Sequence, residues 1–175
     1  MRLKLLALII SLLFMGSVLT GCAGSDHDQA PNVFAEPIKT EKTLPDDFYE
    51  LAERGVLVSK ATNQAEFNEQ WEYFRLGEAP AKVDWDNKAA IFLGIFESGS
   101  CPYEFKYAEL NAGKTDLIIH LEDDSHGRAC TDDATPRTIV LAVDKDETAN
   151  VNHVEISNFY GISPRVEFYD YDANY

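Results

Sequence analysis

The segment "AAIFLGIF", residues 89–96, indicates the fold class of this 175-residue chain, because a short apolar run of this kind is typical of a β-strand. Turn residues separate it from further segments of strand character. A hairpin turn is expected at residues 111–114, and the acidic tail from Arg165 is expected to add an edge strand. The strand segments after the first are "YEFKYAEL" (103–110), "DLIIHLE" (116–122), "TIVLAVD" (138–144) and "VNHVEIS" (151–157).

Two helices are expected before these strands. The segment "PDDFYELAERG" (45–55) begins with acidic residues and ends at a glycine, and "VLVSKA" (56–61) then reads as a strand. Asn63 and Glu66 have the spacing of a capping box, and they precede aromatic residues at helical spacing, which are expected to be core. Two helices followed by consecutive strands predict an α+β domain, with an antiparallel sheet of about five to six strands and both helices packed on one side. The aromatic residues are Phe67, Trp71 and Phe74.

The N-terminal segment has the parts of a secretory signal. Arg2 and Lys4 precede an apolar core that gives way to small residues, and this core is too short and too thinned for the roughly 20 apolar residues of a spanning helix. Leu19-Thr20-Gly21-Cys22 resembles the lipobox of bacterial lipoproteins, in which lipid is attached to the cysteine thiol before cleavage on its N-terminal side. The alternative is an ordinary signal peptide with a chance cysteine, although no A-x-A-like cleavage site fits as well.

These features predict a signal peptide at residues 1–21, a lipidated N-terminus with a flexible tether at 22–45, and a single domain at 46–175. The processed chain is expected to lie on the extracytoplasmic face of the cell membrane, anchored by lipid. Cleavage would leave 13 basic and 30 acidic residues, a formal charge of −17. This charge argues against nucleic acid as a partner and against electrostatic attraction to an anionic bilayer.

Once Cys22 carries lipid, two cysteines are left that can pair with each other. Export places Cys101 and Cys130 where cysteines usually pair, so we expect a disulfide that closes a loop of about 30 residues. A catalytic cysteine or a metal pair is the alternative. Neither cysteine has a C-x-x-C partner, and His126, four residues before Cys130, is the nearest approach to a zinc-ligand spacing.

No serine-hydrolase motif G-x-S-x-G and no metalloprotease motif H-E-x-x-H occurs in the sequence. His27 lies in the expected tether, while His120 and His153 lie within strand patterns, where satisfied face residues are expected. The densest polar segment is "LEDDSHGRACTDDATPR", residues 121–137, a charged loop between strands that suits partner binding. Its candidate binding residues are Glu122, Asp123, Asp124, His126, Arg128, Asp132 and Asp133.

Several short elements resemble the PrcB C-terminal domain family, named for an accessory lipoprotein of a bacterial surface protease complex. They are Val83-Asp84-Trp85-Asp86 before the strand 89–94, "ESGSCPYEF" (97–105) and "ATPRTIVLAVDK" (134–145), within a region of similarity at about residues 55–145. Ser100-Cys101-Pro102 replaces the usual Gly-Gly, and Cys130 is extra. The resemblance implies a related fold and a non-catalytic domain that binds or stabilises an envelope protein.

The sequence therefore predicts a membrane-anchored, non-enzymatic binding or accessory module of the cell envelope, with an envelope protein as its partner and without a cofactor or metal. Two alternatives stay open. One is a small surface hydrolase that uses His126 with its acidic neighbours. The other is a calcium-responsive surface protein, because clustered carboxylates suit calcium, although their spacing departs from the D-x-D-x-D-G loop.

Overall fold

The computed structural model describes residues 32–78 and 82–169, so the expected signal segment and Cys22 lie outside the described residues. The described strands form two sheets. In order of pairing, the five-stranded sheet contains β1 (Asn32–Val33), β5 (Tyr103–Leu110), β6 (Asp116–Asp123), β8 (His153–Ser157) and β9 (Arg165–Glu167). The four-stranded sheet contains β2 (Ala35–Glu41), β7 (Thr135–Asp144), β4 (Lys88–Glu97) and β3 (Val56–Ala61).

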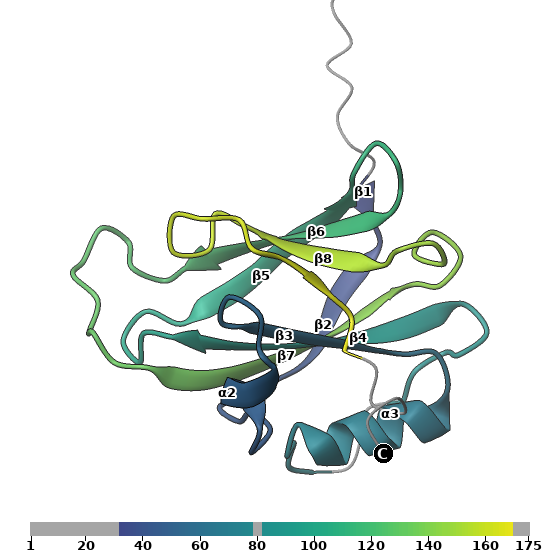
Figure 1. The fold of residues 1–175 in the computed structure, drawn as a ribbon, viewed down its shortest axis with the longest axis horizontal. Helices are drawn as coiled ribbons and strands as arrows, with labels where there is room; N and C mark the ends of the chain where they lie inside the picture. The colour runs from purple at the N-terminus through teal and green to yellow at the C-terminus, as the bar shows by residue number, and fades with distance from the viewer. Residues whose placement is uncertain (1–31, 79–81, 170–175) are drawn as a thin grey trace, which may run out of the picture.

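The two sheets are stacked as layers, and the helices α2 (Phe48–Leu51) and α3 (Gln64–Tyr73) lie beyond the four-stranded sheet (Figure 1). Both helices contribute to one apolar cluster on the outer face of that sheet, where Phe48 of α2 and Phe67 of α3 join Phe92 of β4. The expected α+β class, with both helices on one side, is therefore confirmed. The helices cover the outer face of one of two sheets, the four-stranded one.

Strand β4 is buried on both faces, which explains the unbroken apolar run at residues 89–96. Alternate residues, among them Ile91, Leu93 and Ile95, belong to the core between the sheets. The residues between them, Ala90 and Phe92, belong to the core beneath the helices. The central four-stranded sheet thus separates two hydrophobic cores.

Helix α3 begins as the sequence predicts. The side chain of Asn63 accepts hydrogen bonds from the backbone N–H groups of Ala65 and Glu66, each at 3.0 Å. The Glu66 carboxylate reaches back to the backbone N–H of Thr62 at 2.7 Å, one residue before the cap. The three aromatic residues at helical spacing, Phe67, Trp71 and Phe74, are buried as expected.

The expectation of a single antiparallel sheet is wrong in two respects. The segment 135–144 (β7) pairs with β2 and β4 in the four-stranded sheet, so it leaves the sheet that holds β5 and β6. The chain then returns, and β8 lies beside β6 in the same direction, which makes this pair parallel. A parallel neighbour requires a crossover, and β7 with its loops provides it.

The predicted tether at 22–45 is too long, because residues from Asn32 onward belong to the fold. β1 pairs with β5, and β2 pairs with β7 along Ala35–Glu41. β2 is an edge strand, so it tolerates Pro37 beside a register shift and needs few large apolar side chains. Leu44, which follows it, is buried beneath the helices.

In the part of the chain that the structure describes, no helix is long and apolar enough to cross a membrane.

Gly94 of β4 lies against the helical core, and its replacement by alanine should destabilise the fold. A Cβ atom at this position would lie 2.8 Å from Leu44 Cδ2, 3.2 Å from Phe74 Cε1 and 3.3 Å from Phe48 Cε2. Overpacking of this kind costs about 1–3 kcal/mol. We expect Gly94→Ala to lower the free energy of unfolding in urea by that amount. Gly113→Ala is the control, because its nearest neighbour would be Thr115 Oγ1 at 3.6 Å, and an equal loss in both variants would contradict the prediction.

Candidate binding cleft

A cleft of about 680 Å³ opens at one end of the stacked sheets. Three segments surround it: the turn 98–102 between β4 and β5, the loop 124–134 between β6 and β7, and the loop 158–164 between β8 and β9. We call it the stapled cleft, since both cysteines of the disulfide line it. Its lining includes Tyr103, Glu122, Asp123, His126 and Tyr160.

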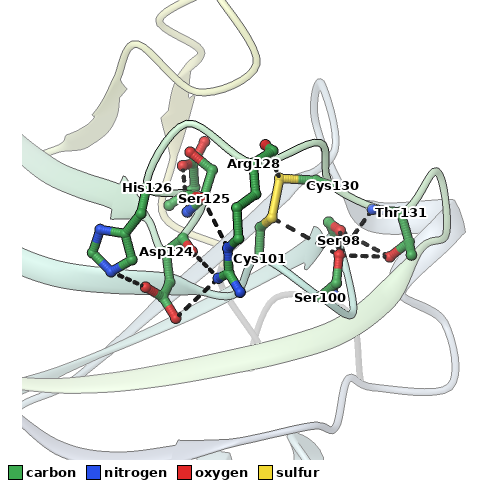
Figure 2. A network of polar contacts seen from close by, with 10 residues as sticks. Ser98, Ser100, Cys101, Asp124, Ser125, His126, Arg128, Cys130 and Thr131 are labelled. Carbon is green, nitrogen blue, oxygen red and sulfur yellow. Dashed lines mark hydrogen bonds and ion pairs between the residues drawn. A yellow bond between two sulfur atoms is a disulfide. The ribbon is translucent and has the colours of Figure 1, made fainter.

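The predicted disulfide is present, with Cys101 and Cys130 joined across 5.6 Å between their Cα atoms (Figure 2). Cys101 is buried in the turn, with 3% of its surface exposed, whereas Cys130 lies in the exposed loop. A bridge that closes a loop of this length stabilises a fold by about 3–4 kcal/mol in the chain-entropy account. It ties the loop 124–134, which has no regular structure of its own, to the end of β4 and β5.

Hydroxyl groups hold the same two segments together (Figure 2). Ser100 Oγ accepts a hydrogen bond from the backbone N–H of Thr131 at 2.9 Å, and Ser98 Oγ lies 3.0 Å from Thr131 Oγ1. Asp133 Oδ1 accepts the backbone N–H of Gly99 at 3.0 Å. Gly99 allows this approach, because a Cβ atom there would lie 2.5 Å from Asp133 Oδ2. The bonds from Thr131, Gly99 and Thr135 lower the pKa of the Asp133 carboxyl.

The predicted residues at the tip of the loop form a second cluster. His126 Nε2 lies 2.5 Å from Asp124 Oδ1, and Arg128 donates to the backbone oxygens of Asp124 and Ser125 at 2.7 and 3.1 Å. His126 and Gly127 both have left-handed backbones, with φ of 45° and 77°, which turn the loop sharply. The His126 side chain is 80% exposed, so this pair lies at the rim of the cleft.

Two tyrosines form the wall opposite this loop. The Tyr160 hydroxyl donates to the backbone oxygen of Phe96 at 3.2 Å, and its ring meets the Tyr103 ring edge-on at 5.8 Å. The Tyr103 ring also packs against Phe159 at 5.3 Å. Burial raises the pKa of both tyrosine hydroxyls, and the nearby carboxylate of Glu97 adds to the effect in each case. The hydroxyl bond to Phe96 and the ring contacts with Phe159 and between the two tyrosines hold this wall in place.

A buried ion pair lies beneath the cleft. Glu97, the last residue of β4, has no exposed surface, and its Oε1 accepts a hydrogen bond from Arg137 Nε at 2.7 Å. Its Oε2 accepts the backbone N–H of Tyr103 at 2.8 Å. This carboxylate thus joins the ends of β4, β7 and β5, and it fixes the first residue of β5 at the cleft.

The structure brings some of the predicted binding residues together and separates others. Glu122, Asp123 and His126 line the cleft, while Asp124 and Arg128 organise the loop behind it. Asp133 belongs to the hydroxyl network, and Asp132 is exposed to solvent.

The strand histidines are engaged on the outer face of the five-stranded sheet. The His120 ring stacks on Tyr107 at 4.1 Å and bonds Glu109, while His153 lies 2.9 Å from Arg165 Nη2 and 3.2 Å from Glu167 Oε1.

Sequence reasoning missed the wall opposite the loop, namely Tyr103, Tyr160 and the supporting Glu97. The one available signal was the position of Glu97 directly after an apolar strand, where a buried carboxylate needs a fixed partner. Among residues 32–78 and 82–169, no three His, Cys, Asp or Glu side chains lie close enough together to hold a metal ion.

No protein-family model matches the chain, and no curated protein and no solved structure matches it either.

The lowered pKa of Asp133 predicts a pH-dependent contribution to stability. A carboxyl whose pKa is lower in the folded state stabilises the fold above its unfolded pKa, near 4, and loses this effect as the pH falls through the folded value. We therefore expect Asp133→Asn to unfold at a lower urea concentration than the wild type at pH 7, with the difference shrinking below about pH 4.

Asp132→Asn is the matched control, because both carboxylates are exposed to solvent and, of the two, Asp133 accepts the hydrogen bonds from Gly99, Thr131 and Thr135. It should leave the urea midpoint at pH 7 close to the wild-type value. A similar drop in both variants, or a drop in Asp133→Asn that persists at low pH, would contradict the assigned role of Asp133.

Proposed function

We propose that this chain is a lipid-anchored, extracytoplasmic and non-enzymatic binding protein, and that the stapled cleft holds part of an envelope protein. The observation that carries the proposal is the construction of the cleft. A disulfide and a hydroxyl network fix one wall, and packed tyrosine rings form the other. A site whose walls are fixed before binding loses less entropy when a ligand is bound.

The polar groups around the cleft are used to hold its shape. Ser98 and Ser100 bond to Thr131, and the Ser125 backbone N–H donates to Asp123 Oδ1 at 3.0 Å. His126 is paired with Asp124 at the exposed rim. This arrangement supports recognition by a rigid surface, with loops carried on a packed scaffold.

The position of the cleft suits a domain that is tethered from its N-terminus. β1 pairs with β5 at Glu109 and Ala108, whereas the cleft adjoins Tyr103 at the opposite end of β5. Eight residues of strand separate these ends by about 25 Å. Figure 1 shows β1 and the loop between β6 and β7 at opposite ends of the five-stranded sheet. A lipid at Cys22 would thus leave the cleft facing away from the membrane.

The anchor itself rests on the sequence Leu19-Thr20-Gly21-Cys22. Residues 22–31 separate the proposed lipid from β1, and a chain of ten residues spans at most about 35 Å. The domain would therefore stay near the membrane, where its partner would be another protein of the envelope.

Lipid attachment can be tested in the cells that make the protein. We expect the wild-type chain to incorporate an alkyne fatty acid and to sediment with membranes, and Cys22→Ser to lose the label and the sedimentation. Ser25→Ala is the control, because it changes a residue of the same segment and leaves the Cys22 thiol in place, so it should keep both the label and the sedimentation. Equal labelling of wild type and Cys22→Ser would contradict the anchor.

Partner binding can be tested by placing p-benzoylphenylalanine at Tyr160, which lines the cleft and is 61% exposed. Irradiation of intact cells is expected to give a discrete adduct with an envelope protein. The same amino acid at Tyr49, an exposed tyrosine on α2 outside the cleft, is the matched control and should not give this adduct. The absence of any adduct specific to position 160 would contradict the proposed function.

A further inference from the structure

We infer that the stapled cleft receives a lysine or arginine side chain from a basic segment of the partner protein. The inference rests on the proposed function and names the chemistry that the same site would recognise. It follows from the charges, the aromatic wall and the size of the cleft.

The charges that line the cleft are mainly negative. Asp123 contributes a carboxylate, and among the described residues that line it there is no lysine or arginine. Asp123 Oδ1 accepts the Ser125 N–H, and no lysine or arginine nitrogen of the described chain lies within ion-pair distance of this carboxylate. The Glu122 side chain points to the other face of β6, where its carboxylate lies 3.2 Å from Lys106 Nζ. The cleft therefore offers the carboxylate of Asp123 to an incoming cation.

The aromatic wall suits the same kind of ligand. The Tyr160 ring is largely exposed at the mouth of the cleft, while its hydroxyl is held by the Phe96 oxygen. A cation over the face of a tyrosine ring gains about 0.5–2 kcal/mol, and the methylene groups of a lysine or arginine stem can lie along the ring. A carboxylate beside an exposed ring thus matches both parts of such a side chain.

The overall charge of the chain favours the same kind of ligand. The chain as a whole carries 30 acidic and 15 basic residues, so a basic partner would also be attracted at longer range.

The size of the cleft favours a side chain on a peptide segment over a bare ion. Its volume of about 680 Å³ lies in the range of sites for small organic ligands, so it can hold a long side chain together with neighbouring backbone. Charge complementarity then selects a basic segment, since acidic side chains would face Asp123.

The test uses the full chain in a non-ionic detergent and two short peptides that carry a neutral dye. One peptide contains lysine and arginine, and the other contains acetyl-lysine and citrulline at the same positions. We expect the basic peptide to bind at least about tenfold more tightly by fluorescence anisotropy, and to weaken as salt rises.

Variants of the full chain locate the binding. Asp123→Asn should weaken the binding of the basic peptide about tenfold, and Tyr160→Leu should also weaken it. Glu36→Gln removes one exposed carboxylate from β2, away from the cleft, and should leave the affinity unchanged. Circular dichroism and urea unfolding of each variant show whether the fold is retained.

Crosslinking at position 160 separates the two proposals. If the adduct forms in cells and is lost when Asp123 is neutralised by Asp123→Asn, the inference is supported. If the adduct persists undiminished, or if the neutral peptide or a neutral oligosaccharide binds as tightly as the basic peptide, the inference is overturned while the proposed function stands. If no adduct forms at all, the proposed function fails, and the inference fails with it.

Discussion

The fold depends on one constraint, which is that β4 must be covered on both faces. Its ten residues carry an almost unbroken apolar sequence, so neither side can face water. One side is covered by the five-stranded sheet through the core that contains Ile91 and Leu93, and the other by the two helices through Phe92. Gly94 shows how closely the helical side is packed, because a single added carbon would collide with Leu44. The layer order of sheet, sheet and helices follows from this requirement.

The apolar and polar patterns of the strands already distinguish the two sheets, which the number and order of the strands do not. β5, β6 and β8 alternate apolar with polar residues over much of their length, as expected for a sheet with one wet face, whereas β4 and the centre of β7 are continuously apolar. This contrast assigns the strands to different sheets, although strand order alone suggested one sheet. The positions of the helices and strands were predicted well, because the Asn63 cap and the turn at 111–114 are local signals. The sequence did not predict that residues 32–45 belong to the fold, because β2 is held through backbone pairing with β7.

The sequence predicted one wall of the cleft and did not predict the other. The disulfide followed from the number of cysteines, and the charged loop from its composition. The opposite wall comes from segments about sixty residues apart, and Tyr103 and Tyr160 meet only because β5 and β8 flank β6. Tyr160 also has a left-handed backbone, with φ of 49°, which no local sequence rule predicts for a tyrosine. Long-range pairing and local backbone strain are the two kinds of information that a pattern of apolar and polar residues lacks.

Glu97 connects the core to the cleft. Burying a carboxylate costs several kcal/mol in desolvation, and pairing with Arg137 does not guarantee a net gain over apolar side chains of similar size. Its second oxygen, however, accepts the N–H of Tyr103, which would otherwise lose its partner next to the cleft. The same carboxylate therefore sets the start of β5 relative to β4 and β7, and with it the ring that supports Tyr160. A buried charge at the end of an apolar strand is best understood here as a device that positions the wall of the cleft, while the stability of the domain comes from the two cores on either side of β4.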